Sequence, residues 1–192
     1  MKYNFLQNIL RKMVFIVAKP MFFLSLKGKE NIPNSPYIIC ANHRSYWDPV
    51  FIIISFEKPV IFMAKSELFR LWFLSPILKL FGAFPVQRGK SDIKAIKKSV
   101  EVIKEGKILG IFPEGKRNKT DQTILKGEKG VATIVKLTNV PVLPVAICGE
   151  IKPFHKVSIV IGNPIKFNKE DNNEEIVEKI MLSIKELIEK EK

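Results

Sequence analysis

A chain of 192 residues, of which 46% are hydrophobic, is long enough for one domain with a sizeable core. It carries 32 basic and 19 acidic residues, a formal net charge of +13, and most of the excess lies in residues 1–168, which hold 27 bases and 11 acids. Such a chain attracts anions: phosphate esters, nucleic acid, an acidic carrier protein or an anionic membrane. Since no internal repeat, low-complexity tract or long linker is present, a repeat architecture is excluded.

Helical and strand-like segments alternate along the chain. Apolar residues at helical spacing predict an amphipathic helix over residues 3–18. Short apolar runs predict strands at Tyr37–Cys40, Val60–Met63, Ile108–Phe112, Val142–Ile147 and Val157–Ile161. Further helices are predicted over Val50–Phe56, from a cap at Ser91 to Gly106, and around Ile176–Ile188. This alternation predicts an α/β fold, with a central sheet flanked by helices and its chemistry in loops at the strand ends.

The hydrophobic runs are too short to cross a membrane. The longest uncharged run, Leu137–Gly149, has 13 residues and contains two prolines. A spanning helix needs about 20 predominantly apolar residues. The sequence therefore predicts no transmembrane span, although the N-terminal segment could enter a bilayer. Cys40 and Cys148 lie in apolar runs, which indicates reduced, packed thiols of a cytosolic protein.

The most informative segment is Asn42–Asp48, which follows the first predicted strand and contains His43 and, five residues on, Asp48. A neutral imidazole is the side chain best suited to accept a proton near neutral pH, and a neighbouring carboxylate fixes its tautomer. Residues i and i+5 point to different faces of a continuous helix, so contact between these two side chains requires a turn. The segment predicts a histidine base supported by a carboxylate.

Pro49 allows a second interpretation of the same segment. Because proline suits the first turn of a helix, Asp48 would stand at the N-cap of the predicted helix over Val50–Phe56. Asp48 could then be only a cap, and His43 only a loop residue. A metal site is a third interpretation, but such sites usually need more nitrogen, sulfur or oxygen ligands than we find here, so no metal is expected.

Three other clusters contain or follow apolar runs. In Phe112–Asn118, a glycine lets the backbone approach a ligand closely, and Arg117 offers a planar fork that matches phosphate or carboxylate. The segment Gly82–Arg88 also delivers an arginine, and Val140–Ile147 is apolar with two prolines. Taken singly, these are a polar hairpin, a surface arginine and a buried strand with edge prolines. A histidine–carboxylate pair with two arginines, each after an apolar run, is not explained in this way.

The four clusters, in this order and spacing, resemble the four motif blocks of the glycerolipid acyltransferases, specifically the bacterial 1-acyl-glycerol-3-phosphate acyltransferases. The first block, a histidine followed after four residues by an aspartate, is similar to His43 and Asp48. The second, a Gly…Phe…Arg pattern, is similar to Gly82, Phe84 and Arg88. Four ordered motifs make this resemblance far more specific than any one of them.

The third block of that family resembles Phe112–Arg117, and the fourth resembles Val140–Ile147. The segment Gly28–Pro33 also resembles the lead-in of the family, so the resemblance extends from about residue 26 to about residue 150. One departure is Asn118, which stands where serine is usual. We expect its amide to replace the hydroxyl as a polar contact.

The resemblance implies a single-domain glycerol-phosphate acyltransferase-like fold over residues 27–192, with a mixed, mostly parallel sheet and an N-terminal amphipathic membrane-docking segment over residues 1–26. It implies transfer of a fatty acyl group from a thioester to the sn-2 hydroxyl of lysophosphatidic acid, which gives phosphatidic acid. The donor, acyl-CoA or acyl-carrier protein, is then a substrate and no cofactor is expected. The sequence leaves the choice of donor open.

The catalytic roles implied by the resemblance go to His43, as the general base, and to Asp48, as the carboxylate that holds the imidazole. The acceptor's own hydroxyl takes the place of the serine of a hydrolase triad. Cys40 is a conceivable acylated nucleophile, but it lies in an apolar strand and the family transfers the acyl group directly. We therefore expect no acyl-enzyme.

The substrate-binding roles fall to the other clusters. Arg88 and Arg117 would bind the acceptor phosphate, and Glu114 with Gly115 would line the glycerol site. Lys65 follows a predicted strand and is a further phosphate candidate, or simply a solvated lysine.

An enzyme whose acceptor and product lie in a bilayer needs a docking surface. The segment Leu68–Phe81 is rich in aromatic residues and carries Arg70 and Lys79, and residues 1–30 hold six Lys or Arg. Together they predict an interfacial surface for anionic lipid, at the cytoplasmic face of the membrane. The alternative, that Trp72 and Phe73 belong to core helices, stays open.

Two other functions compete with this one. The same fold could acylate another lysolipid acceptor, although two arginines favour a phosphate monoester. A non-catalytic basic module for membrane or nucleic acid would instead show basic residues interleaved with exposed aromatics along one face. The lysines are scattered and no nucleic-acid motif is present, so the expected partners are lysophosphatidic acid, the acyl donor and an anionic membrane surface, without nucleic acid.

Overall fold

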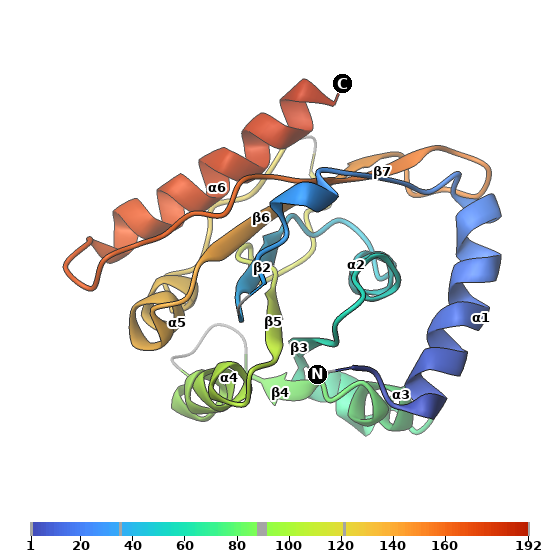
Figure 1. The fold of residues 1–192 in the computed structure, drawn as a ribbon, viewed down its shortest axis with the longest axis horizontal. Coiled ribbons are helices and arrows are strands. Elements are labelled where there is room, and N and C mark those ends of the chain that lie inside the picture. The colour runs from blue at the N-terminus through green and yellow to red at the C-terminus, as the bar shows by residue number, and fades with distance from the viewer. Residues whose placement is uncertain (1, 35, 88–91, 121, 192) are drawn as a thin grey trace.

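The structure, a computed structural model, describes residues 2–34, 36–87, 92–120 and 122–191. Its centre is a seven-stranded sheet in the order β1-β7-β6-β2-β5-β3-β4 (Figure 1). Neighbouring strands are parallel except for β6 and β7, which run antiparallel. The predicted α/β fold with a mixed, mostly parallel sheet is confirmed.

The strands are β1 (Ser25–Lys27), β2 (Ile38–Ala41), β3 (Val60–Lys65), β4 (Phe84–Val86), β5 (Ile108–Ile111), β6 (Val142–Gly149) and β7 (Val157–Ile161). The α-helices are α1 (Phe5–Met21), α2 (Asp48–Ser55), α3 (Ser75–Leu80), α4 (Ile93–Lys104), α5 (Gly130–Thr138) and α6 (Asn173–Lys190). Two short 3₁₀ helices, η1 (Lys29–Asn31) and η2 (Ser66–Arg70), complete the described elements.

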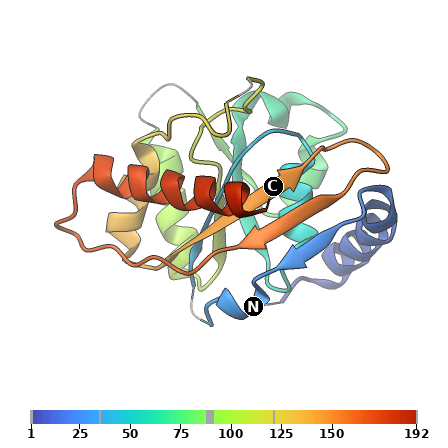
Figure 2. The ribbon, with the colours of Figure 1, turned by 90° about the horizontal axis from the view of Figure 1, so that it is seen from above.

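Helices cover both faces of the sheet. Figures 1 and 2 show α4, α5 and α6 on one side of it and α1 and α2 on the other. The central strand β2 is buried along its whole length, and its residues alternate between the two sides. Ile38 and Cys40 pack in the core beneath α4, α5 and α6, whereas Ile39 and Ala41 pack in the core beneath α1 and α2. Burial on both faces explains why this strand is an unbroken apolar run.

The sequence predicted the longer elements and missed short ones. All five predicted strands are present, with ends that differ by at most two residues, and so are the four predicted helices. The strands β1 and β4 were not predicted, because three residues are too few to be recognised as a strand-like apolar run. The helices α3 and α5 were also missed; they have 6 and 9 residues, below the length at which an apolar run can be told from a strand. The predicted boundary between residues 26 and 27 falls inside β1, and the division into two parts stays a prediction.

Two helix caps differ from the predicted ones. The N-cap of α4 is Asp92, whose side chain accepts the N–H of Ala95 at 3.0 Å, and Ser91 lies outside the described residues. Asp48 is the first residue of α2, after Trp47, so the predicted N-cap role for Asp48 is wrong. Its carboxylate turns back towards the preceding loop instead of capping the helix.

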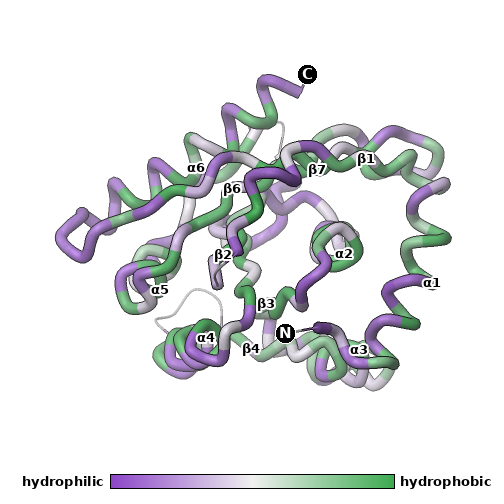
Figure 3. The backbone as a smooth tube through the Cα atoms, viewed as in Figure 1, coloured by the Kyte–Doolittle hydropathy of each residue, from purple (hydrophilic) through white to green (hydrophobic). Residues whose placement is uncertain are grey.

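Apolar side chains remain exposed on α1 and around α3. Figure 3 shows hydrophobic stretches along both helices. The interpretation of Trp72 and Phe73 as core residues is wrong, because Trp72 is 86% exposed and Phe73 is 57% exposed. The other exposed apolar residues of this surface, which we call the α1–α3 surface, are Phe5, Leu6, Ile9, Met13, Phe15, Ile16, Val17, Leu71 and Ile77. Every helix among the described residues is too short or too polar to span a bilayer.

Candidate active site

The site forms where two neighbouring parallel strands end. In β2 and β5, Cys40 lies opposite Ile111, so the segments that follow the two strands emerge at the same edge of the sheet. One segment carries His43 and the other carries Glu114, which are 71 residues apart in the sequence. The expectation that the chemistry lies in loops at the strand ends agrees with this placement.

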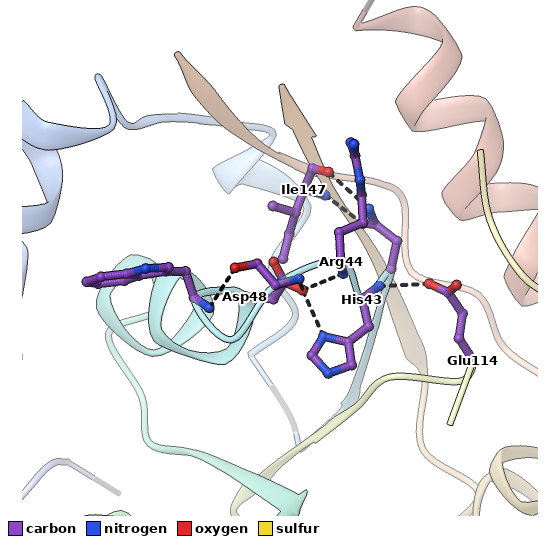
Figure 4. Close-up of polar contacts among 8 residues, drawn as sticks. His43, Arg44, Asp48, Glu114 and Ile147 are labelled. Carbon is purple, nitrogen blue, oxygen red and sulfur yellow. Dashed lines mark hydrogen bonds and ion pairs between the residues drawn. The ribbon is translucent and has the colours of Figure 1, made fainter. Parts of the chain in front are cut away.

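His43 and Asp48 are in direct contact. The Nδ1 atom of His43 lies 2.7 Å from Oδ2 of Asp48, and the two side chains point towards each other in Figure 4. His43 as a whole residue is 7% exposed, and Asp48 is fully buried. An ionised carboxylate can only accept hydrogen bonds, so the proton of the neutral imidazole lies on Nδ1 and the lone pair lies on Nε2. The geometry therefore leaves Nε2 to accept a proton.

A turn brings this pair together, as the spacing required. The same Oδ2 atom of Asp48 accepts the backbone N–H of Arg44 at 2.6 Å and that of Ser45 at 2.7 Å. The loop after β2 thus curls around the carboxylate, and its backbone holds the carboxylate in place. Charge-assisted bonds of this kind are about twice as strong as neutral ones. Two backbone N–H groups consequently fix the Asp48 carboxylate that orients the imidazole.

Glu114 joins three segments of the site. Its Oε1 accepts the backbone N–H of His43 at 2.7 Å, and its Oε2 accepts the backbone N–H of Leu125 at 3.0 Å. The side chain is only 1% exposed. Burial raises the pKa of the Glu114 carboxyl, and the two backbone hydrogen bonds partly oppose that rise. The contact with glycerol predicted for Glu114 stays a prediction, because both carboxylate oxygens are already bound to backbone amides.

Two further contacts hold the segment that carries His43. Asn42 pairs with the backbone of Ile147 in β6, donating from Nδ2 at 3.0 Å and accepting at Oδ1 from the Ile147 N–H at 2.7 Å. On the other side, the N–H of Asn118 donates to the carbonyl of His43 at 2.6 Å. The Asn118 side chain binds Thr120 and Gln122 within its own loop, and its replacement of the usual serine as a polar contact stays a prediction.

Two aromatic rings stack in series against the imidazole of His43. The ring of Phe112 stacks on His43 with centroids 4.1 Å apart and an interplanar angle of 17°. Phe62 in β3 stacks in turn on Phe112, with centroids 5.3 Å apart. Gly110 in β5 provides the space for Phe62, since an added Cβ would lie 2.6 Å from Cζ of that ring. The imidazole is thus oriented by packing as well as by its hydrogen bond.

The predicted phosphate ligands have different surroundings. The guanidinium carbon of Arg117 lies 3.6 Å from the ring centroid of Tyr46. Arg88 lies outside the described residues, although β4, the strand that precedes it, ends beside Lys65 at the same edge of the sheet. Lys65 forms an ion pair with Glu67 at 2.9 Å, and this hydrogen bond is the main cause that lowers the pKa of Glu67 to about 2. Both interpretations of Lys65 stay open.

Gly115 occupies a position that only glycine fits well. Its φ angle is 66°, in the left-handed region, and an added Cβ would lie 2.9 Å from Cγ of Glu128. The turn brings Gly115 N–H to the carbonyl of Phe112 at 3.0 Å. The tight turn after β5 therefore depends on this glycine, and its predicted place at the glycerol site stays a prediction.

The sequence patterns predicted no role at the site for Asn42, Tyr46, Phe62 or Phe112. Asn42, Tyr46 and Phe112 lie inside the motif segments, and this position could have indicated that they belong to the site. Nothing in the sequence linked Phe62 to the site, because its role depends on the packing of β3 beside β5.

The thiol of Cys40 is a poor nucleophile. It is fully buried in β2, and that burial raises its pKa, which disfavours the reactive thiolate. Burial likewise raises the pKa of Cys148 to about 11. The part of the chain that the structure describes contains no cluster of three His, Cys, Asp or Glu side chains that could hold a metal ion.

The chain is similar to known acyltransferases in sequence and in fold. A family model described as Acyltransferase matches residues 23–148. A solved structure, the 1-acyl-sn-glycerophosphate acyltransferase of Thermotoga maritima, superposes with a TM-score of 0.77 at 27% identity, covering 96% of this chain and 77% of that one.

Two bacterial relatives carry the same activity in their names. The chain is 32% identical over 155 residues to the 1-acyl-sn-glycerol-3-phosphate acyltransferase of Bacillus subtilis, with 74% of this chain and 76% of that protein covered. It is 35% identical over 158 residues to the protein of that name from Streptococcus pneumoniae, with 77% of this chain and 58% of the relative covered. Because the family model matches more than half of its length, and a histidine–carboxylate pair lies at the strand ends of this fold, the chain belongs to the acyltransferase family.

Proposed function

We propose that this chain transfers a fatty acyl group from an acyl thioester to the sn-2 hydroxyl of lysophosphatidic acid, which gives phosphatidic acid in phospholipid biosynthesis. The relatives from Bacillus subtilis and Streptococcus pneumoniae are named for the acylation of this acceptor. The observation that carries the proposal is the 2.7 Å contact between Nδ1 of His43 and Oδ2 of Asp48, which leaves Nε2 free to act as a base.

The proposed reaction is a direct transfer. Nε2 of His43 takes the proton of the sn-2 hydroxyl as its oxygen attacks the thioester carbonyl, and the tetrahedral intermediate then loses the thiolate by cleavage of the C–S bond. The imidazolium returns its proton to the departing sulfur, so His43 ends the cycle neutral. Asp48 and the face of Phe112 both favour the imidazolium that forms in between, through a charge pair and a cation–π contact. An acyl thioester is already activated, so the proposed reaction uses no cofactor.

Arg117 is the proposed ligand of the acceptor phosphate. Its guanidinium belongs to the segment after β5, and the next residue, Asn118, is bonded to the backbone of His43. The planar guanidinium can donate two parallel N–H···O hydrogen bonds to the oxygens of a phosphate monoester. Arg88 is proposed as the second ligand from its sequence position alone. Lys65, Glu114 and Gly115 remain candidates for lining the rest of the acceptor site.

The acceptor reaches this site from a membrane in our proposal. The α1–α3 surface carries exposed Trp72 and Phe73, and Arg70 and Lys79 flank them in the sequence. Exposed aromatic residues with cationic neighbours suit the interface of an anionic bilayer. We propose a peripheral protein on the cytoplasmic face, with lysophosphatidic acid as acceptor and acyl-CoA or acyl-carrier protein as donor. Both donors are acidic and suit the net charge of +13.

The test is an assay of the purified protein with lysophosphatidic acid and each donor in turn. We expect phosphatidic acid to form, and we expect His43→Ala to abolish turnover while lipid association is kept. Arg117→Gln should raise the KM for lysophosphatidic acid, whereas Lys119→Gln, which removes a charge two residues away, should leave it near the wild-type value. Turnover with a different lysolipid only would replace the proposed acceptor, and an inactive wild-type protein that still binds lipid would favour the non-catalytic module.

A further inference from the structure

An exposed aromatic ring lies against the proposed phosphate ligand. The Cζ atom of Arg117 is 3.6 Å from the centroid of the Tyr46 ring, well within the range of a cation–π contact. Tyr46 is 66% exposed and belongs to neither of the two core clusters. Among the described residues, no carboxylate forms an ion pair with Arg117. The ring therefore has a partner that core packing does not explain.

The two residues belong to segments that the site already holds together. Tyr46 lies in the turn between His43 and Asp48, whose backbone is bound to the Asp48 carboxylate through Ser45. Arg117 precedes Asn118, whose N–H donates to the carbonyl of His43 at 2.6 Å. The backbone next to each of the two residues is thus held beside the proposed base, so the contact between ring and guanidinium lies close to the reacting atoms.

We infer that Tyr46 is a positioning residue for Arg117, and that its ring holds the guanidinium plane so that the N–H edge is presented to the acceptor phosphate. The inference rests on the proposed function, because it requires Arg117 to bind that phosphate. A guanidinium that stacks through its face keeps all of its in-plane N–H donors available. Stacking also restricts a long, flexible side chain before the substrate arrives, which lowers the cost of ordering it on binding.

This role predicts an effect on acceptor binding and not on the chemical step. Neither the His43–Asp48 hydrogen bond nor the stacking of Phe112 on His43 involves the Tyr46 side chain. Replacing the ring should therefore raise the KM for a phosphorylated acceptor and leave kcat and stability nearly unchanged. The contact with Arg117 uses the face of the Tyr46 ring, so the inference needs the ring and not its hydroxyl.

The experiment is a double-mutant cycle with Y46L, R117Q and the combined variant, with Y46F as the conservative substitution. The acceptor is a short-chain lysophosphatidic acid below its micellar concentration, which removes membrane docking from the measurement. We expect Y46L to raise KM roughly two- to five-fold, the range of an exposed cation–π contact, with kcat within about two-fold of wild type. Y46F should keep the wild-type KM, and Y46L should add nothing in the R117Q background.

Three outcomes overturn the inference. An equal rise in KM on adding Y46L to R117Q would mean that Tyr46 contacts the lipid itself. A fall in kcat alone in Y46L would mean that Tyr46 supports the turn that carries His43 and Asp48. An unchanged KM in Y46L would mean that the ring does not position Arg117. The proposed function fails separately, if the wild-type protein forms no phosphatidic acid from this acceptor. If the wild type is active and R117Q alone leaves the KM unchanged, Arg117 is not the phosphate ligand.

Discussion

The ring of Phe112 lies nearly parallel to the imidazole of His43, with the two centroids 4.1 Å apart. The face of an aromatic ring carries negative charge density and attracts a cation, so this stack favours the imidazolium that appears when the base has taken its proton. Asp48 favours the same species through Nδ1, from a different direction. The proposed base is thus supported by two residues that act on its charged form, one by its charge and one by its ring.

Asp48→Asn should lower kcat by about 10²–10⁴-fold and change the KM for lysophosphatidic acid little. An asparagine can still accept the N–H of Arg44 and Ser45, but it lacks the charge that stabilises the imidazolium and can turn the imidazole to the wrong tautomer. Steady-state kinetics measure the effect.

The matched control is Asp171→Asn, which changes a carboxylate that also accepts a backbone N–H, that of Asn168, in a loop outside the site. We expect its kcat to equal that of wild type. A fall in kcat of equal size in both variants would show that Asp48 contributes only to folding.

Gly110→Ala should disturb the site from a position that contacts no substrate. Its Cβ would lie 2.6 Å from Cζ of Phe62, so the ring must move, and Phe112 and His43 rest on that ring. We expect a loss of about 1–3 kcal/mol in the free energy of unfolding, as for other overpacked cores, measured by urea denaturation. We also expect a fall in kcat of roughly tenfold or more, because small displacements of catalytic groups are costly.

The second variant for this test is Gly110→Ala combined with Phe62→Leu, which removes the clashing ring atoms. Stability and kcat should both recover relative to Gly110→Ala alone. Full activity in the single variant would show that the position of Phe62 does not affect the base.

The titration of Glu114 should make stability depend on pH in a defined direction. Burial raises the pKa of this carboxyl above its ordinary value of 4.5, so the folded protein binds its proton more tightly than the unfolded chain does. The stabilisation from this group is therefore complete below pH 4.5 and is lost as the pH rises through the raised pKa. The free energy of unfolding of wild type, relative to that of Glu114→Gln, should fall across this range.

Urea denaturation of both proteins at a series of pH values measures this difference. At every pH, Glu114→Gln should also carry a constant cost of about 1–3 kcal/mol, because an amide nitrogen cannot accept the N–H of His43 or Leu125. If the free energy of unfolding of wild type relative to Glu114→Gln stays constant or rises with pH, the raised pKa of Glu114 is contradicted.

Cys40→Ala should leave turnover largely intact, because the buried thiol does not take part in direct transfer. Its removal from β2 should lower the free energy of unfolding by about 1 kcal/mol, a typical cost of a single substitution. Kinetics and intact-protein mass measurements during turnover check this prediction. Loss of activity together with loss of a trapped acyl-enzyme would establish Cys40 as a nucleophile.

Trp72→Ser with Phe73→Ser should weaken binding to anionic vesicles at low salt by roughly tenfold, because two exposed aromatic side chains would no longer enter the interface. Vesicle flotation measures the bound fraction. Activity on a soluble short-chain acceptor should be preserved, since neither residue belongs to the candidate site.

The control for this pair is Ile93→Ser with Leu137→Ser, two residues that are 64% and 59% exposed on α4 and α5, across the sheet from α1. Its flotation should match that of wild type. Equal losses in both double variants, or a wild-type protein that stays unbound, would contradict docking through the α1–α3 surface.

The local patterns of the sequence were enough for the longer elements and for the motif residues. The five predicted strands are present at short apolar runs, and the four predicted helices where apolar residues repeat at helical spacing, because both patterns follow from the burial of a single element. The contact between His43 and Asp48 was also predicted, since only one short turn separates them. The predicted N-cap role of Asp48 was wrong because the sequence spacing fits a helix cap and a catalytic carboxylate equally well. The hydrogen bonds that Oδ2 accepts from the preceding loop show that the carboxylate does not cap the helix.

What the sequence alone determined is therefore the family, the α/β alternation and the identity of the proposed base and its carboxylate. Only the tertiary structure decided which distant residues meet: Glu114 with the backbone of His43, Asn42 with Ile147, and Tyr46 with Arg117. Parallel strands are joined by long crossovers, so their order in the sheet is not encoded in any short window of sequence. The pattern within each element is fixed by its own neighbours along the chain, whereas the assembly of the site depends on how whole strands pack side by side.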